Sequence, residues 1–173
     1  LLLFLKISYY YDGTKIIKYH SHSMDTIDTI MKSIVNLRIH IAPVGFEIDR
    51  IIIPATTQKA DKVWLIAHDN VSEDKAAKYR EKIEKELEKN GIKTEIAYAN
   101  RLRLFPIIKA VTDIIFKERK NEIYVNVASG SKIHAIGCMM ACMLFDDRER
   151  IHPFYAQAEQ YPEYDGELQQ TYG

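Results

Sequence analysis

The chain has 173 residues, 47% of them hydrophobic, and its 24 Lys and Arg balance its 24 Asp and Glu. This length suits one α/β domain with a small appendage, and the balanced charge argues against direct binding of duplex DNA, which a basic excess usually accompanies. Two cysteines and no apolar run near the roughly 20 residues that cross a membrane exclude a disulfide framework and a membrane helix, so we predict a reduced, cytoplasmic location.

The first 36 residues differ from the rest of the chain. The pair Asp12-Gly13 separates the runs Leu1–Tyr11 and Thr14–Tyr19, which is typical of a β-hairpin, and Met24–Asn36 is a candidate short helix. Three interpretations stay open for this segment: a hairpin at a sheet edge, an arm that faces a partner, or an appended sequence.

From residue 37 onward, predicted strands alternate with predicted helices. The strands are Leu37–Ala42, Lys62–His68, Lys93–Ala99, Glu122–Ala128 and Ile151–Ala158. The helices are Phe46–Lys59, ended or interrupted near Pro54, Ser72–Asn90, with Ser72 as N-cap and Gly91 after its end, Phe105–Lys120 and Ser131–Phe145. This alternation predicts right-handed βαβ units in a mostly parallel sheet with helices on both faces, over residues 37–160. Residues 161–173 are polar and patternless and are expected to be a linker or tail.

Two turns are the candidate site. Ligands of such sheets bind beyond the carboxyl ends of the strands, where the strand order reverses, and the turns Pro43–Glu47 and Ala128–Lys132 follow the first and fourth strands. In the second turn, Asn126 stands near the strand end and Ser129, Gly130 and Ser131 lead to Lys132.

The second turn has the chemistry of a phosphate site. A strand, a turn of small residues and a helix start bring backbone N–H groups and the positive end of a helix dipole to one spot, beside two hydroxyls and an ammonium. The alternative from the residues alone is that Ser131 only caps the helix and Gly130 only turns the chain.

Two segments carry a family resemblance. Ile39–Arg50 (IHIAPVGFEIDR) resembles the opening of the CARF domain, the CRISPR-associated Rossmann-fold sensor, most closely in the archaeal branch where it precedes a winged helix-turn-helix. Asn126–Lys132 (NVASGSK) resembles the family's Asn-x-(Thr/Ser)-Gly-Gly-(Thr/Ser)-Lys signature. Ser129 and Ala128 depart from it, where the family often has a glycine or threonine and a hydroxyl.

The resemblance implies a Rossmann-like three-layer sandwich that forms a homodimer, binds a cyclic oligoadenylate across the two-fold axis and needs no cofactor or metal. It also implies an output domain outside this sequence, through which alone DNA would be contacted. By motif match, the phosphate contacts are Ser131 and Lys132 and the facing loop is Gly45, Phe46 and Glu47. Two alternatives stay open: a metal-independent ring nuclease that uses Lys132 and Ser131, and a regulator that binds DNA through this segment itself.

Further candidates lie on the same edge of the predicted sheet. His68 and Asn100 end the second and third strands and are candidate ligand contacts, with Arg101 as a further phosphate contact. His134 is interpreted as a surface or interface histidine rather than a ligand contact, and Arg50 as an ion-pair partner of Asp49 or of a second subunit.

The helix from Ser131 is hydrophobic on every face and is expected to meet a partner subunit, with Gly137 and Ala141 allowing close approach. Cys138 and Cys142 are expected in the core rather than on a metal.

Overall fold

The computed structural model describes residues 9–11, 16–18 and 36–157, and the chain divides into two units, 1–36 and 37–173. In the first unit β1 (Tyr9–Tyr11) pairs antiparallel with β2 (Ile16–Lys18). The predicted turn at Asp12-Gly13 and residues 24–35 of the predicted helix lie outside the described residues.

The second unit is built on a five-stranded, all-parallel sheet in the order β5-β4-β3-β6-β7. Its strands are β3 (Arg38–Pro43), β4 (Lys62–His68), β5 (Lys93–Ala99), β6 (Glu122–Asn126) and β7 (Ile151–Phe154). The chain runs outward from β3 through β4 to β5 and then returns to place β6 beside β3. The strand order therefore reverses between β3 and β6, the first and fourth strands of the sequence prediction.

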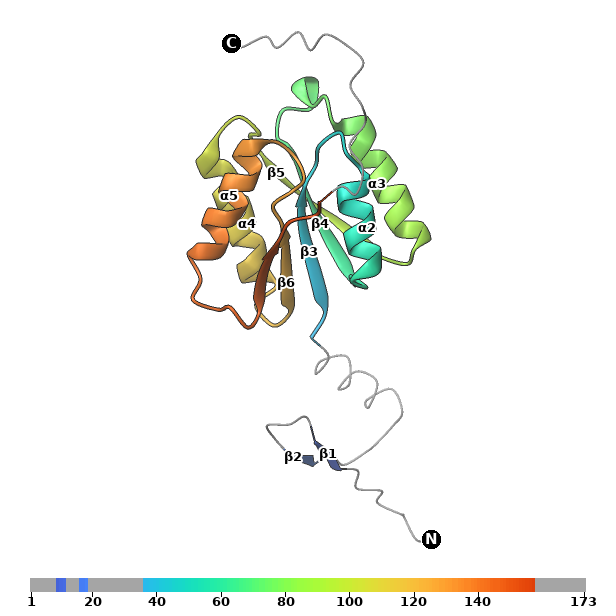
Figure 1. Cartoon of the computed structure of the whole chain (residues 1–173), viewed down its shortest axis with the longest axis vertical. Helices are drawn as coiled ribbons and strands as arrows, with labels where there is room; N and C mark the ends of the chain where they lie inside the picture. Colours follow the sequence, from blue (N-terminus) through green and yellow to red (C-terminus); the bar gives the residue numbers. More distant parts are fainter. Residues whose placement is uncertain (1–8, 12–15, 19–35, 158–173) are drawn as a thin grey trace, which may run out of the picture. The chain divides into compact units, whose positions relative to one another are not determined.

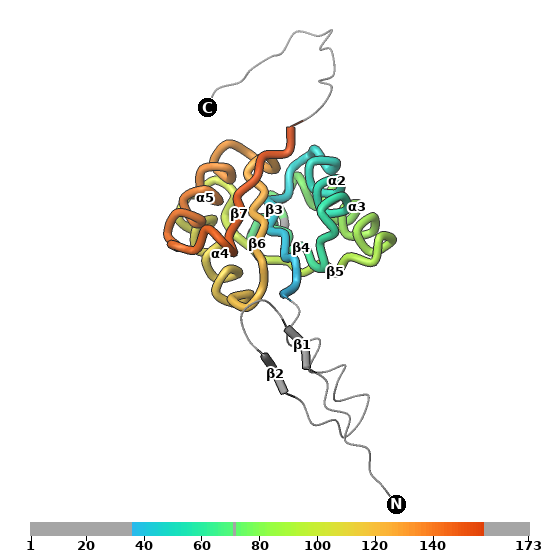
Figure 2. Tube along the Cα trace, turned by 60° about the horizontal axis from the view of Figure 1, so that its bottom comes forward, coloured from blue at the N-terminus to red at the C-terminus, as the bar shows by residue number. Residues whose placement is uncertain are grey.

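Helices cover both faces of this sheet and make a three-layer sandwich. Figures 1 and 2 show α2 (Asp49–Thr57) and α3 (Ala77–Lys89) on one side, with α4 (Leu104–Lys117) and α5 (Lys132–Met143) on the other. Each side has its own apolar core: Val63, Leu65 and Ile83 belong to one, and Ile41, Ile107 and Ile123 to the other. Burial on both faces explains why β4 reads as a nearly continuous hydrophobic run. The predicted α/β fold is confirmed.

The start of α3 differs from the prediction. Ser72 is not the N-cap: its backbone N–H and its hydroxyl both donate to Asn70 Oδ1, at 3.2 and 2.7 Å, within a short 3-10 turn (Val71–Glu73). Asp74 Oδ1 then accepts the backbone N–H of Ala76 at 3.0 Å, and the helix begins at Ala77. Asparagine and aspartate compete with helix in this way, because their side chains satisfy nearby backbone donors.

The small residues of α5 serve the packing of helices within this chain. A Cβ on Gly137 would lie 2.7 Å from Ile107 Cγ2 of α4, and Ala141 is fully buried. The expectation that these two residues allow a partner subunit to approach is therefore wrong.

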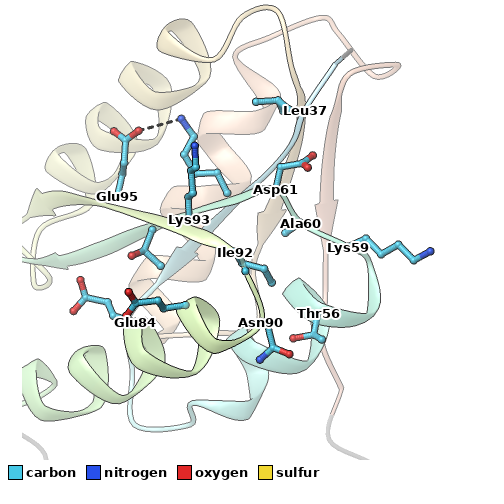
Figure 3. A pocket seen from close by; sticks show the side chains of 14 residues that line it. Leu37, Thr56, Lys59, Ala60, Asp61, Glu84, Asn90, Ile92, Lys93 and Glu95 are labelled. Carbon is cyan, nitrogen blue, oxygen red and sulfur yellow. Dashed lines mark hydrogen bonds and ion pairs between the residues drawn. The ribbon is translucent and has the colours of Figure 1, made fainter. Parts of the chain in front are cut away.

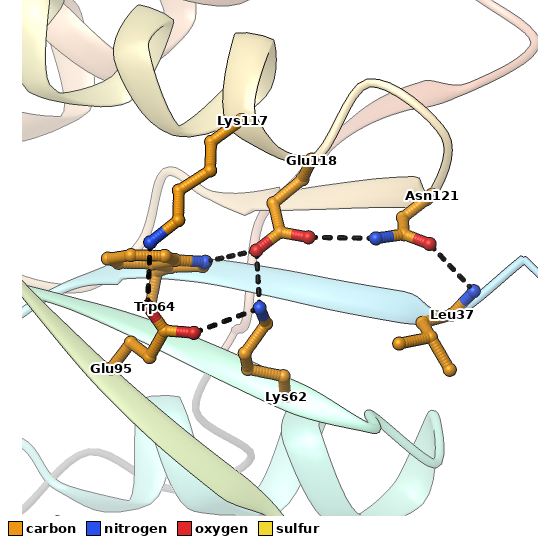
Figure 4. A network of polar contacts seen from close by, with 7 residues as sticks. All are labelled: Leu37, Lys62, Trp64, Glu95, Lys117, Glu118 and Asn121. Carbon is orange, nitrogen blue, oxygen red and sulfur yellow. Dashed lines mark hydrogen bonds and ion pairs between the residues drawn. The ribbon is translucent and has the colours of Figure 1, made fainter.

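A polar network lies at the end of the sheet where the strands begin, away from the predicted site (Figure 4). The Glu118 carboxylate accepts hydrogen bonds from Lys62, from Trp64 Nε1 at 2.9 Å and from Asn121 Nδ2 at 2.7 Å, and Asn121 Oδ1 accepts the Leu37 N–H at 3.2 Å. Burial alone would raise the pKa of Glu118, but these donors hold that pKa below its usual value. The buried Glu118 carboxylate is thus paired with Lys62, and the network has a structural role.

Candidate functional site

The loops after β3 and β6 touch backbone to backbone at the point where the strand order reverses. A Cβ on Gly45 would lie 3.0 Å from both Cα and N of Gly130. Gly130 itself has φ +74°, and a Cβ there would lie 2.9 Å from Pro43 Cβ and 3.0 Å from His134 Nδ1. The lack of a side chain at these two glycines therefore allows the backbones of loops 44–48 and 127–131 to pack in direct contact.

Asn126 holds the second loop in place. Its side-chain Oδ1 accepts the backbone N–H groups of Ala128 and Ser129, at 2.9 and 3.1 Å, and its Nδ2 donates to the carbonyl of Arg50 at 2.7 Å. Pro54, four residues on inside α2, has no N–H and cannot make the usual helical bond to that carbonyl. Asn126 is thus a buried clamp between β6 and α2; direct contact of its side chain with a ligand stays a prediction.

The Arg50 side chain contacts three segments near the same loops, at Glu47, Ala128 and Ala156. Its guanidinium pairs with Glu47, and its NH1 group donates to the carbonyls of Ala128 and Ala156, at 3.3 and 3.5 Å. The expected structural ion pair exists, but with Glu47 rather than Asp49, since neighbouring residues on a helix do not face each other. Glu47 remains 67% exposed beside the loop.

The start of α5 is fixed by a histidine. Ser131 is the N-cap; its N–H donates to His134 Nδ1 at 3.2 Å, and its Oγ lies 2.9 Å from the same nitrogen. Burial, with the nearby charges of Arg101 and His68, lowers the pKa of His134 to about 4, so the ring is neutral at pH 7 and Nδ1 accepts. His134 is only 5% exposed, so its interpretation as a surface or interface residue is wrong.

The remaining loop residues differ in exposure. Lys132 is exposed at the first position of α5, where the first N–H groups have no partner within the helix. Ser129 is buried, and its hydroxyl makes no hydrogen bond with any described residue. Phe46 is 60% exposed, and the centroid of its ring lies 5.2 Å from that of the Tyr79 ring. Asn100 Oδ1 accepts the Leu102 N–H at 3.1 Å, which is turn chemistry.

A pocket of about 190 Å3 opens beside these loops, between the carboxyl ends of the strands and the start of α5. Six of the predicted residues line it: Gly45, Phe46, His68, Arg101, Gly130 and Ser131. Glu47, Asn100, Asn126, Ser129 and Lys132 are not in its wall. Sequence reasoning missed His134 and Asp74 as lining residues, although the Ser-x-x-His spacing at the helix start was a usable signal for the first.

A larger hollow of about 1190 Å3 lies at the opposite end of the sheet, where the strands begin (Figure 3). Its wall mixes charges of both signs, including Lys59, Glu84 and Lys93. Ligands of open parallel sheets bind at the carboxyl ends of the strands, so the smaller pocket has the position expected of a site and the larger one does not.

The cysteines do not form a metal centre. Cys138 and Cys142 are free and buried, and burial raises the pKa of both thiols, that of Cys142 to about 11. Among the described residues, no group of three or more His, Cys, Asp and Glu side chains is placed to hold a metal ion. The same residues include no helix that is long and apolar enough to cross a bilayer.

Residues 38–161 match the family model described as "HFX_2341_N:-like, N-terminal". The chain belongs to this family. One curated relative of this chain, the uncharacterized protein MJ1513 of Methanocaldococcus jannaschii, is 35% identical to it over 127 residues, which is 70% of the chain. The chain spans 38% of the length of that relative.

Several solved structures of other proteins share the fold of this chain. Can2 of Sulfobacillus thermosulfidooxidans, in complex with cyclic tetra-adenylate, superposes with a TM-score of 0.56 at 12% identity, over 69% of this chain and 32% of Can2. Csm6 of Enterococcus italicus, bound to cyclic hexa-2′-fluoro-hexa-dAMP, gives 0.52 at 14% identity, over 72% and 35%. A type III CRISPR defence DNA nuclease activated by cyclic oligoadenylate gives 0.54 at 16% identity, over 68% and 18%. At these identities the likeness establishes the Rossmann-like fold of CARF-domain proteins.

Proposed function

We propose that this chain is a sensor domain that binds a cyclic oligoadenylate between the two subunits of a homodimer and regulates an attached output domain. The observation that carries the proposal is the contact between loops 44–48 and 127–131 at the strand-order reversal, where α5 begins. Three proteins with the same fold bind or are activated by such rings or their analogues, which supports this ligand class over other phosphates.

The loop residues suit a ring of phosphates. The start of α5 offers backbone N–H groups and a partial positive charge, and Lys132 adds a mobile ammonium at the same point. Two-fold symmetry would present each of these donors twice to a ligand of matching symmetry. A protein of zero net charge then binds a polyanion through local, preorganised donors.

An exposed apolar face on α5 supports the dimer. Ile136, Met139, Met140 and Met143 are between 42% and 75% exposed on a helix whose other side fills the core. Apolar patches of this kind mark contact surfaces on proteins in water. A second subunit on this face would bring two copies of the α5 start toward one axis.

The output domain would be a DNA-binding winged helix, as in the CARF branch that the sequence resembles. The longer chain of the Methanocaldococcus relative, of which this chain spans 38%, leaves room for such a domain. A ring that bridges both subunits favours one dimer geometry, and that preference would bias the attached domains by population shift.

The direct test is calorimetric titration with cyclic tri-, tetra- and hexa-adenylate, with linear oligoadenylates of equal length as controls. We expect one ring size to bind with a dissociation constant at least tenfold lower than its linear counterpart. Equal or absent binding of all rings would refute the proposal.

Ring cleavage is a second candidate function, and one contact favours it. The Ser131 hydroxyl lies 2.9 Å from the neutral His134 ring, next to Lys132. A ribose 2′-hydroxyl would attack the adjacent phosphorus, forming the O2′–P bond and breaking the P–O5′ bond to leave a 2′,3′-cyclic phosphate. The 2′-hydroxyl gives up its proton and the leaving 5′-oxygen takes one up to become a 5′-hydroxyl, while Lys132 stabilises the developing charge. Incubation with cyclic tetra- and hexa-adenylate in EDTA tests this: linear products support cleavage, and unchanged rings leave a sensor only.

A further inference from the structure

The two outer strands of the sheet, β5 and β7, differ in what they leave unpaired. In a parallel ladder only alternate residues of a strand bond to a given neighbour, so an outer strand directs the N–H and C=O groups of every second residue away from the sheet. A free row of such groups is a template for another strand, and proteins normally block or cover it.

The outer edge of β7 is blocked. The Arg150 carbonyl accepts the Ile123 N–H of β6 at 2.8 Å. By alternation, Ile151 and Pro153 face outward. The Ile151 N–H already donates to the Asp147 carbonyl at 2.9 Å, and Pro153 has no N–H. Neither residue therefore offers a free donor to a further strand, which is a usual effect of proline in an outer strand.

The outer edge of β5 has no such block. The Lys93 N–H donates to the Asp61 carbonyl beside β4 at 3.3 Å, so the odd-numbered residues of β5 bond to β4. Thr94, Ile96 and Tyr98 therefore direct their N–H and C=O groups outward. These groups have no hydrogen-bond partner among the described residues, and residues 93–98 are only half-buried or exposed. The strand holds no proline, and its register with β4 is unbroken by a bulge.

The sequence of β5 is complementary to a second copy of itself. When two β5 strands lie antiparallel with Ile96 opposite the partner's Ile96, Thr94 lies opposite the partner's Tyr98. Residues that face the shared edge then form the hydrogen-bonded pairs, so all the outward N–H and C=O groups of residues 94, 96 and 98 are paired in both copies. The facing side chains are β-branched with β-branched and β-branched with aromatic, combinations that stabilise antiparallel strands.

The charges of β5 are compatible with this register. Lys93 and Glu95, its charged residues, both lie opposite alanines of the second copy, so no like charges are directly opposed. The Glu95 carboxylate also pairs with Lys62 and Lys117 of its own chain, at 3.1 and 3.0 Å. The two copies of Glu95 would therefore approach the axis with their charges already compensated.

We propose that the outer edge of β5 is an interface at which two copies of this chain join their sheets into one continuous sheet. The same surface on both copies makes the contact, so two-fold symmetry closes it. It is separate from the loops around Gly45 and Gly130, and from α5, which packs on β6 and β7 at the other side of the sheet. A chain that uses both this edge and the proposed ring-binding interface joins dimers into larger assemblies, still with one ring for every two chains.

The first test is sedimentation of the full chain without any ring, in two double variants that change the same positions. Thr94→Lys with Tyr98→Lys places like charges opposite each other across the interface, whereas Thr94→Lys with Tyr98→Glu places opposite charges there. At equal protein concentration, we expect the first variant to sediment at half the mass of the unchanged protein and the second to keep the full mass. Equal masses of all three proteins would overturn the proposal.

Hydrogen exchange of single amides is the second test, and it contains its own control for folding. In the variant with two lysines, the Ile96 amide should exchange at least tenfold faster than in the unchanged protein. The Glu95 and Ala97 amides, which face β4, should keep their protection. Equal protection of Ile96 in the two proteins, or unprotected Ile96 in the unchanged protein, would contradict the interface. Neither test involves a ring, so a negative result leaves the sensor proposal standing.

Discussion

Asn126 supplies a hydrogen bond that Pro54 cannot: its side-chain amide donates at 2.7 Å to the Arg50 carbonyl, the group that a backbone N–H at position 54 would bond. Pro54 in α2 and Asn126 at the end of β6 therefore act together, and they hold the second loop of the site against the helix that follows the first loop. The prediction that the helix ends or is interrupted near Pro54 is wrong, because α2 continues through Pro54 to Thr57 and Asn126 donates to the carbonyl that the proline cannot bond.

We predict that Asn126→Ala destabilises the protein by about 3 kcal/mol, because it removes the acceptor of two loop N–H groups and one donor to the Arg50 carbonyl. In a Pro54→Ala background the new helical N–H can bond the Arg50 carbonyl, so the same substitution should cost about 1 kcal/mol less. Urea unfolding of the two single variants and the double variant measures this coupling. Additive effects would show that Asn126 and Pro54 act independently.

Gly130 should tolerate no side chain. Gly130→Ala meets both the unfavourable φ of +74° and the Pro43 and His134 atoms at 2.9 and 3.0 Å, so we expect a loss of about 3 kcal/mol in unfolding free energy. Gly91→Ala is the matched control, since Gly91 has φ +72° but no atom within 4 Å of an added Cβ, and should cost about 1 kcal/mol. Equal costs in thermal or urea unfolding would contradict the close contact of the loops.

Lys132 is predicted to contact the ligand phosphates. Lys132→Gln should reduce the affinity for the bound ring by about 1.5–3 kcal/mol per site, the range of a charge-assisted hydrogen bond, with unfolding free energy nearly unchanged because the side chain is exposed. Lys120→Gln, an equal charge change at an exposed residue after α4, serves as control. If both variants bind the ring equally well, the phosphates lie elsewhere.

Stability should fall in mild acid because of two buried histidines. Burial, with Arg38 for His40 and with Arg101 and His68 for His134, lowers each pKa to about 4 from the ordinary 6.5. Each ring is neutral in the folded protein but takes a proton on unfolding below pH 6.5, so stability is retained above that pH and lost toward pH 4, by about 3 kcal/mol per histidine.

The substitution His40→Phe checks this account, since it keeps an aromatic ring beside Tyr124 but removes the titration. Urea unfolding between pH 7 and pH 4 should then show a loss smaller by about 3 kcal/mol than in the unchanged protein. An identical pH dependence of the two proteins would exclude His40 as a source.

Much of the fold follows from the sequence because hydrophobic runs and their spacing report burial directly. β4 and β5 begin and end at the predicted residues, and Ser131 caps α5 as expected. The start of α3 could not be placed, because the choice between helix and turn at Ser72 rests on the Asn70 side chain, which offers the backbone an equally satisfactory partner.

The candidate site was predictable in position but not in its internal bonds. Topology alone brings together the turns that contain Gly45 and Gly130. The Ser-x-x-His spacing was the one signal for the role of His134 at the start of α5, and it was easy to miss because a capping box usually has Glu or Gln at that position. The hydrogen bond from the Arg101 backbone N–H to His68 Nδ1 depends on which strands pair, and no local pattern reports that.

The stoichiometry of the ligand complex tests the central claim most directly. Native mass spectrometry of the protein with cyclic tetra- or hexa-adenylate should show one ring on two chains, because each subunit supplies one copy of the loops around Gly45 and Gly130. A complex of one ring on one chain, or a protein that stays free of ring at millimolar ligand, would contradict the account.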